Sequence, residues 1–359
     1  MSPQQAPLVS VVTPVYSGGE YLRECIESVI AQRYDNWRYT IVNNCSTDDT
    51  LEIAQHYASR DPRIRVYDNA EFLPIIDNHN HAISLIDPES AYCKPLMADD
   101  WLYPECIDTM VSCALTQPSI GLVCTCASTG NNTILFDRLR PADSPTSSPT
   151  TVLAGGIACR ISMLEDRYFF GSPTTMLIRA DLIRKRRPFY NPLNLHADEE
   201  SCYDILQESD FAFVHQALVF IRVHERSHTS SVHRLESMLA ARLYALAKFG
   251  HVYLTVEEFQ RRYHDKLAEY YARLAAAAVE LRGRRFWEFH RTMLIQIGAP
   301  LDRSRLTRAI ALHVARRLAS PGSLVRGVFS RMMSMRKTGS RKPERSPSAE
   351  ASTPSVKRH

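Results

Sequence analysis

An alternation of strand and helix patterns over roughly the first third of the chain constrains the fold more than any other feature. Short apolar runs typical of buried strands lie at 8–13, 38–43, 63–67, 91–97 and 121–127. Between them apolar residues recur at helical spacing, first from Leu22 to Ile30. This β-α-β-α order predicts an α/β fold, with a mostly parallel sheet covered by helices on both faces.

The remaining patterns are less regular. We expect a surface loop at 138–156, where Pro, Ser and Thr are frequent, followed by a helix through Leu164. A strand at 173–179, a helix at 198–208 and two strands at 211–214 and 218–222 are expected after it. From Leu235 to about Ala319 nearly every pattern is helical. Residues 321–359 are basic and rich in Ser and Pro, which predicts a disordered tail because little apolar surface offsets the entropy of ordering.

Charge and cysteine content narrow the class of protein. The net charge of +4 is too small to indicate a nucleic-acid partner. Nine cysteines without a CxxC pair, and no signal peptide, favour free thiols in a reducing cytoplasm. No window is long and apolar enough to span a bilayer. The basic tail allows peripheral contact with anionic lipid at the inner face of the membrane, although a solvated tail is the simpler alternative.

Polar clusters follow three of the predicted strands, where ligands of parallel sheets bind. They read TPVYSGGE, NNCSTDD and MADDW, and neither GxGxxG nor GxxxxGK[ST] occurs, which disfavours dinucleotide dehydrogenases and P-loop enzymes. Asp99 and Asp100 close a strand with two carboxylates. Such a pair suits Mg²⁺ or Mn²⁺ bridging a diphosphate to the protein. The alternative for Asp100 is that it caps the following helix.

The motifs together resemble those of the family 2 glycosyltransferases, which have the GT-A fold. The resemblance is dense from Val9 to Ala127, through VSVVTPVYSGGEYLRECIESVIAQRYDNWRYTIVNNCSTDD and MADDWLYPE, and thinner from Gly171 to His228. It implies an inverting transfer of a sugar from a nucleotide-sugar, most simply a UDP-sugar, to a hydroxyl of a sugar or lipid-linked acceptor. Cell-surface polysaccharide or lipopolysaccharide synthesis is the corresponding pathway expectation.

The resemblance also implies a domain plan. The glycosyltransferase domain is expected over 1–232, with a donor half at about 8–130 and an acceptor half at about 152–230. A helical extension is expected over 233–320, before the tail at 321–359. This extension can pack on the core, bind a partner or lie on a membrane. Its mixed apolar stripe at Leu306, Ile310 and Val314 favours the first two.

Carried over position by position, the family's donor contacts fall on a defined set of residues. They are Pro14, Tyr16 and Glu20 near the base and ribose, Asn43, Asn44 and Asp48 in the second segment, His79 and Asn80 near the diphosphate, and Asp99, Asp100 and Arg222. Asp48 can instead simply cap a helix, and His79 can be a surface residue. Asn43, His79 and Met97 depart from the family pattern, which usually has Asp, Arg and Asp there.

Metal and catalytic roles are implied for three further residues. Asp99 would hold the metal with His224, and Asp198 would act as general base, with Glu199 as the nearby alternative. The helix dipole can also explain both acids in a first turn. Residues 171–175 would line the acceptor side. The three departures support one rival, a catalytically inactive nucleotide-sugar-binding scaffold of the same fold.

Overall fold

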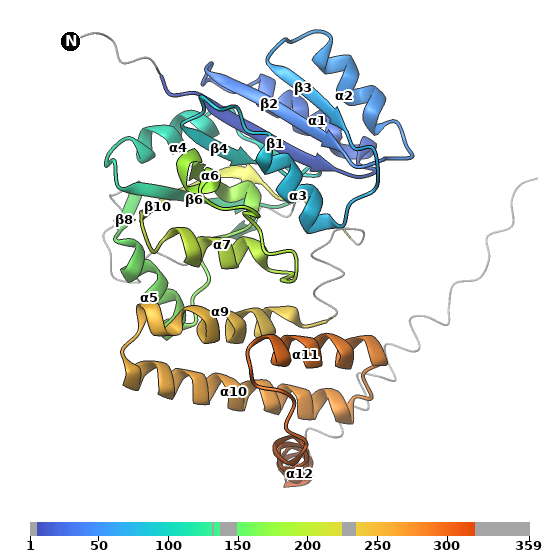
Figure 1. The fold of residues 1–359 in the computed structure, drawn as a ribbon, viewed down its shortest axis with the longest axis vertical. Helices are drawn as coiled ribbons and strands as arrows, with labels where there is room; N and C mark the ends of the chain where they lie inside the picture. Colours follow the sequence, from blue (N-terminus) through green and yellow to red (C-terminus); the bar gives the residue numbers. More distant parts are fainter. Residues whose placement is uncertain (1–5, 131–132, 137–148, 225–234, 320–359) are drawn as a thin grey trace, which may run out of the picture. The chain divides into compact units, whose positions relative to one another are not determined.

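One sheet of ten strands organises the molecule (Figure 1). The structure, a computed structural model, describes residues 6–130, 133–136, 149–224 and 235–319. The strands follow the order β3-β2-β1-β4-β9-β6-β10-β5, with β7 beside β6 and β8 beside β10. The expected boundary at 232 and the tail at 321–359 lie outside the described residues.

The amino-terminal half of the sheet is parallel, as predicted. Its strands are β1 (Val9–Val15), β2 (Trp37–Asn43), β3 (Ile64–Asp68) and β4 (Tyr92–Pro95). The helices along this half are α1 (Gly19–Ile30), α2 (Thr50–Ala58) and α3 (Ile75–Ser84), whereas α4 (Cys106–Ala114) packs on strands of the other half. Val15 pairs with Asn43, and Asn43 pairs with Asp68. Three strands therefore end level at one edge of the sheet.

The other half mixes parallel and antiparallel pairs. It contains β5 (Trp101–Leu102), β6 (Ile120–Ser128), β7 (Ile134–Leu135), β8 (Thr150–Leu153), β9 (Met176–Arg179) and β10 (Asp210–Phe220). The parallel pair is β6 with β10, while β9 runs antiparallel between β4 and β6. The helices of this half are α5 (Gly155–Glu165), α6 (Ala180–Arg184) and α7 (Ala197–Ile205).

Three local predictions are wrong. The two strands expected at 211–214 and 218–222 form the single strand β10, whose register against β6 shifts between Val214 and Ala217. The end of the expected loop pairs with β10 as β8. The strand expected from Pro173 begins with the 3₁₀ turn η1 (Pro173–Thr175), because proline has no N–H to donate to a ladder.

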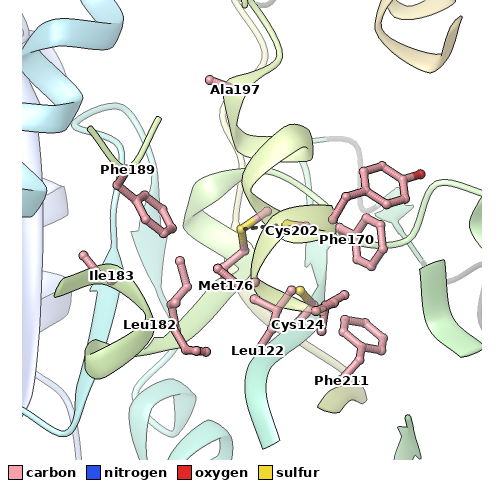
Figure 2. Close-up of a cluster of buried hydrophobic side chains, with 14 of the residues drawn as sticks. Leu122, Cys124, Phe170, Met176, Leu182, Ile183, Phe189, Ala197, Cys202 and Phe211 are labelled. Atoms are coloured by element: carbon pink, nitrogen blue, oxygen red, sulfur yellow. Dashed lines mark hydrogen bonds between the residues drawn. The ribbon is translucent and has the colours of Figure 1, made fainter. Parts of the chain in front are cut away.

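Apolar side chains cover both faces of the sheet. Along β1, Val11 belongs to one buried cluster and Val12 to the other, as expected for a strand enclosed on both sides. Figure 2 shows the cluster beneath α7, where the sulfur of Cys202 lies 3.9 Å from that of Met176 on β9. This packing fixes α7, which carries Asp198, against the sheet. All nine cysteines are free, in agreement with the expected thiols.

The carboxyl-terminal region is helical, as predicted. It comprises α9 (Ser237–Tyr253), α10 (Val256–Val279), α11 (Arg284–Gln296) and α12 (Arg303–Ala319). The chain divides into two units: Tyr271–Arg282 and the residues from Asp302 form the second, and everything else forms the first. In the second unit the Tyr271 hydroxyl accepts a hydrogen bond from the Asp302 amide.

The helix α12 lies in the second unit, and none of its residues is buried. It contains five arginines and no acidic residue. Among the described residues, no helix is both long enough and apolar enough to cross a membrane.

Candidate functional site

The predicted polar segments meet at the carboxyl edge of the parallel strands. Val15, Asn43 and Asp68 end adjacent strands in register, and β4 lies on the other side of β1. The residues after β4 include Asp99 and Asp100. The convergence expected from the sequence is therefore confirmed.

Asp99 and His224 form the polar pair next to β4. Nε2 of His224 lies 3.0 Å from Oδ2 of Asp99, and the two side chains are 23% and 31% exposed. Among the described residues, no group of three or more His, Cys, Asp and Glu side chains gathers as a metal cage. The carboxylate suits Mg²⁺ or Mn²⁺ when substrate phosphates and waters supply the other ligands, and a nitrogen ligand such as the imidazole favours the transition metal Mn²⁺ over Mg²⁺. The donor set therefore fits the cation that the resemblance implies.

Asp100 lies behind this pair and is buried. Its Oδ2 accepts a hydrogen bond of 2.6 Å from the Thr174 hydroxyl, and its Oδ1 accepts one of 3.0 Å from the Arg222 amide. Burial, followed by the charge of Asp99, raises the pKa of Asp100 to about 7. The alternative that Asp100 caps the next helix is wrong, because α4 has Glu105 at its N-cap.

A buried lysine extends the network around Asp100. The ammonium group of Lys94 donates a hydrogen bond to the carbonyl of Thr174, whose hydroxyl also accepts one of 3.1 Å from the Met97 amide. Burial lowers the pKa of Lys94. The network joins the end of β4, the turn η1 and the end of β10, so it sets the geometry of the segment that carries Asp99.

Arg222 is held by protein groups on several sides. Its Nε donates to the Asp99 carbonyl at 3.1 Å, and its Nη2 pairs with Glu24 at 2.5 Å. The guanidinium carbon lies 4.5 Å from the centre of the Tyr21 ring. The side chain expected near the diphosphate thus ties α1 to the Asp99 turn.

A small pocket lies between β1, β4 and α3. Its lining includes Pro14, His79, Met97 and Tyr190. The resemblance marked the first two as donor contacts and Met97 as a departure. The ring centres of His79 and Tyr190 are 6.2 Å apart. The Tyr190 hydroxyl is buried without a hydrogen-bond partner among the described residues, so it is available to a polar ligand.

Two residues predicted to contact the donor instead hydrogen-bond the backbone of the protein through both the oxygen and the nitrogen of their side-chain amides. Asn80 donates to the Tyr190 carbonyl at 2.8 Å and accepts from the Tyr190 amide at 2.7 Å. Asn44 makes the same pair of bonds with Leu73, both of 2.9 Å. These side chains hold the loops that carry Tyr190 and Leu73.

The remaining predicted donor residues line the edge of β1 and β2. Asn43 is buried and donates a hydrogen bond of 2.7 Å to the exposed Asp68. Asp48 accepts hydrogen bonds from the amides of Thr50 and Gly19, while the N-cap of α2 is Asp49. Tyr16 is exposed beyond β1, and Glu20 is exposed in the first turn of α1.

The two candidate bases occupy different surroundings in the first turn of α7. Asp198 is half-buried, and burial raises its pKa to about 6. After burial, its charge is the next cause of the raised pKa of Tyr190, which lines the pocket described above, and of Tyr168, which lines a separate cavity. Glu199 is 3% exposed and lines that cavity with Asp166, Arg242 and Lys266. Burial, followed by the charge of Asp198, raises the pKa of Glu199 to about 8.

In the segment 171–175, expected on the acceptor side, two threonine hydroxyls form hydrogen bonds within the protein. Thr174 bonds Asp100, and the Thr175 hydroxyl bonds the Ser172 carbonyl at 2.8 Å. The Ser172 hydroxyl is buried with no hydrogen-bond partner among the described residues. Tyr190, Asp68 and Lys94 were missed from the sequence. Asp68 and Lys94 could have been found from the sequence, because each is a charged residue near the end of an expected strand. No local pattern marks Tyr190.

The comparisons with known proteins concern the family and the fold. The model of the family described as glycosyl transferase family 2 matches residues 10–186. The putative teichuronic acid biosynthesis glycosyltransferase TuaG of Bacillus subtilis is 45% identical over 60 residues, which cover 17% of this chain and 24% of that protein. An uncharacterized glycosyltransferase of Rickettsia typhi is 26% identical over 230 residues, covering 63% of this chain and 67% of that protein.

The chain spans only 13%, 24% and 30% of the length of three curated relatives that it matches. Among solved structures, TarS residues 1–349 of S. aureus in complex with UDP has a TM-score of 0.59 at 14% identity, covering 89% of this chain and 91% of that one. The mannosyltransferase PcManGT from Pyrobaculum calidifontis, in complex with GDP-Man and Mn²⁺, has a TM-score of 0.51 at 14% identity, covering 89% and 88%. These likenesses concern the fold.

Proposed function

Because the chain belongs to glycosyl transferase family 2 and has the GT-A fold, we propose that it transfers a sugar, with inversion, from a nucleotide-diphosphate sugar to a hydroxyl acceptor. The observation that carries this proposal is the Asp99–His224 pair, with 3.0 Å between its polar atoms, at a strand edge that also presents the pocket lined by His79 and Tyr190. A cation ligand set, a pocket and a carboxylate with a raised pKa are the parts that such a transfer needs.

Asp198 is the proposed general base. As the acceptor oxygen attacks the anomeric carbon and the bond to the diphosphate breaks, its carboxylate takes the proton of the acceptor hydroxyl. A pKa of about 6 leaves most of the carboxylate ionised at neutral pH while keeping it a better base than an exposed aspartate. Glu199 is the weaker candidate because it is buried and lines the other cavity.

Asp99 and His224 are the proposed ligands of Mg²⁺ or Mn²⁺. When bound, the cation would neutralise the negative charge of the departing diphosphate. Asp100, Thr174 and Arg222 support this pair from behind, and Asn44 and Asn80 support the loops of the donor site. We assign these five residues positioning roles, while Pro14, His79 and Tyr190 line the donor pocket and Tyr16, Glu20 and Asn43 lie at its nucleoside end.

A UDP-sugar is the proposed donor. TarS has been solved with UDP and with UDP-GlcNAc, whereas the mannosyltransferase has been solved with GDP-Man. Met97 replaces a carboxylate in the pocket, so it offers the donor an apolar contact rather than a hydrogen-bond acceptor. The proposed acceptor is a sugar or lipid-linked hydroxyl in cell-surface polysaccharide synthesis, as the description of TuaG suggests by analogy.

Contact with an anionic membrane surface from the cytoplasmic side is the proposed setting for the carboxyl-terminal segment. From Arg303 onward the sequence has 14 Lys and Arg against two Glu, a charge of +12, while the whole chain carries +4. Clusters of this kind are attracted to anionic lipid. The exposed Leu312, Val314 and Leu318 of α12 add apolar side chains that can enter the interface.

A donor screen tests the proposed function. Purified protein with Mn²⁺ or Mg²⁺ and a panel of UDP- and GDP-sugars should release nucleoside diphosphate from at least one donor. Asp99→Ala and Asp198→Asn should abolish that release without loss of folding, whereas Asp108→Asn, an exposed acid on α4, should retain it. Full release by both site variants would contradict the assignment. Donor binding without any turnover would favour the scaffold alternative.

A further inference from the structure

A buried carboxylate on α7 holds the segment that leads into this helix. Glu200 is 6% exposed, and its Oε2 accepts a hydrogen bond of 2.8 Å from the side-chain amide of Asn194 and one of 3.1 Å from that of Asn191. The oxygens of these two amides in turn accept the backbone N–H groups of Leu193 at 3.1 Å and His196 at 3.0 Å. The path of the chain into α7 is therefore tied to one carboxylate.

The helix α9 contacts the other oxygen of this carboxylate. The Tyr244 hydroxyl donates to Oε1 of Glu200 at 3.2 Å, and the ammonium group of Lys248 donates to the same oxygen. At the start of α9, the Ser237 hydroxyl lies 2.8 Å from Nε2 of His196. Polar contacts thus join α9 both to α7 and to the segment before it.

The Glu200–Lys248 ion pair is an expensive way to obtain stability alone. The side chain of Glu200 is 6% exposed, whereas that of Lys248 is 46% exposed. Removing a carboxylate from water is costly, so buried ion pairs can often be replaced by apolar side chains without loss of stability. What such a pair does provide is a fixed geometry, because each donor must meet the carboxylate at a set distance and direction.

The geometry that Glu200 fixes is that of the first turn of α7. Asp198 and Glu200 both lie in this turn, two positions apart. Successive residues of an α-helix are rotated by about 100°, so these two side chains leave the helix about 200° apart, on opposite faces. One face is anchored to α9 through Glu200, and the other carries the candidate base. The rotation of Asp198 about the helix axis is therefore set by the anchor behind it.

The donor pocket has an anchor of its own. Tyr190 lines that pocket, and its amide and carbonyl are both held by Asn80 on α3. These bonds do not involve Glu200. A change at Glu200 should therefore displace the base while the donor pocket keeps its shape.

We propose that Glu200 is a positioning residue for the general base, held by Lys248 and Tyr244, so that α9 is a required part of the catalytic site. This inference rests on the proposed function. Through these bonds α7 keeps the rotation that presents Asp198 to the acceptor hydroxyl. Glu200 itself contacts neither the substrate nor the cation in this assignment.

The test combines initial rates of nucleoside diphosphate release from UDP- and GDP-sugars with calorimetric titration of UDP and GDP in the presence of Mg²⁺, all on the full chain. Glu200→Gln and Lys248→Met should each lower kcat by about 10- to 100-fold, the loss that a misplacement of about 1 Å produces. The affinity for the nucleotide that the wild type binds should not change. Glu257→Gln, at an exposed acid on α10, is the matched control and should keep the wild-type kcat.

The double variant distinguishes one shared anchor from two unrelated losses. Because Glu200 and Lys248 act through one ion pair, Glu200→Gln combined with Lys248→Met should lower kcat no further than the larger single effect. Lys248→Met decides the matter if Glu200→Gln does not fold, since the lysine side chain is half exposed and its removal leaves the other donors to Glu200 in place.

Each outcome has a distinct meaning. Unchanged kcat in Lys248→Met overturns the inference and leaves the proposed function intact. A loss of nucleotide affinity as large as the loss in kcat also overturns it, because the damage would then extend to the donor pocket. Losses that multiply in the double variant would show two independent structural effects in place of one anchor. A wild type that releases no nucleoside diphosphate from any donor contradicts the proposed function itself, and this inference with it.

Discussion

His224 and Asp99 stand 125 positions apart in the chain, yet their polar side-chain atoms lie 3.0 Å from each other. The Arg222 amide bonds Asp100, and the Arg222 side chain bonds the Asp99 carbonyl, so the two strand ends are locked together. Hydrogen bonds that involve the backbone of Arg222 and of Asp99 therefore hold the two segments together. The closeness of His224 and Asp99 does not depend on their own hydrogen bond alone.

The first prediction concerns the metal. His224→Gln should raise the concentration of Mn²⁺ needed for half-maximal nucleoside diphosphate release by at least about tenfold, because one of two protein ligands is weakened. A titration of activity against Mn²⁺ measures this. His56→Gln, on the surface of α2, should leave the Mn²⁺ requirement unchanged. An identical requirement in His224→Gln would remove His224 from the metal site.

The second prediction concerns the base. Since burial raises the pKa of Asp198 to about 6, kcat/KM should rise about tenfold per pH unit below pH 6 and level off above it. Asp198→Asn should lose that limb together with the activity, and Glu199→Gln should keep it. Initial rates from pH 5 to 8 in overlapping buffers give the profile. A limb that persists in Asp198→Asn would point to another group.

The third prediction concerns stability and Glu199. Burial raises the pKa of Glu199 from its ordinary value of 4.5 to about 8 in the folded chain, so the folded state binds the proton more tightly than the unfolded one. As pH rises from about 4.5 to 8, the wild type should lose free energy of unfolding relative to Glu199→Gln, and the difference should level off above pH 8. Melting temperatures of both proteins at pH 5 and pH 8 test the sign. A wild type that gains relative stability over this interval would contradict the burial.

The fourth prediction concerns Thr174. Thr174→Val leaves a buried oxygen of Asp100 without its 2.6 Å hydrogen bond, which should lower the free energy of unfolding by about 1–3 kcal/mol. Urea denaturation measures the change. Thr292→Val, whose hydroxyl is exposed on α11, should stay within about 0.5 kcal/mol of the wild type. Equal stability of Thr174→Val and the wild type would mean that Asp100 finds another donor.

The fifth prediction concerns the membrane. The protein should sediment with vesicles containing anionic lipid but not with neutral ones, and salt should weaken the binding. Arg316→Gln with Arg317→Gln should weaken it by about 1–2 kcal/mol, from about 1 kcal/mol for each arginine at the surface. The double variant of the exposed Arg60 and Arg65 is the charge-matched control. Equal loss in both pairs would indicate net charge rather than the carboxyl-terminal segment.

Sequence patterns predicted the parts of the fold that depend on local periodicity. The apolar run of β1 and the spacing of Leu22, Cys25 and Ile26 in α1 were enough to predict these two elements. The repeat of a strand or a helix can be recognised within a few neighbouring residues of the sequence. The strand β10 was predicted as two, since the polar His215 and Gln216 look like a break. In the sheet a register shift accommodates them.

The site could be predicted only where a residue sits in a recognisable segment. Asp99 and Asp198 belong to such segments. The role of Asp100 could not be predicted, because its partners Thr174 and Arg222 are 74 and 122 positions away. The place of Tyr190 in the pocket could not be predicted either. Its backbone is held by Asn80, which lies 110 positions earlier, and no short pattern indicates a pairing at that separation.

The two asparagine clamps have a consequence for how this scaffold can change its ligand. Asn44 and Asn80 each satisfy both backbone groups of one loop residue, so the loops keep their path without help from the side chains that they display. The exposed Phe72 can therefore be exchanged for other side chains at little cost to the loop, whereas Tyr190 is buried in the core and its exchange would lower stability. Variation of the side chain without loss of the fold is thus confined to the exposed loop.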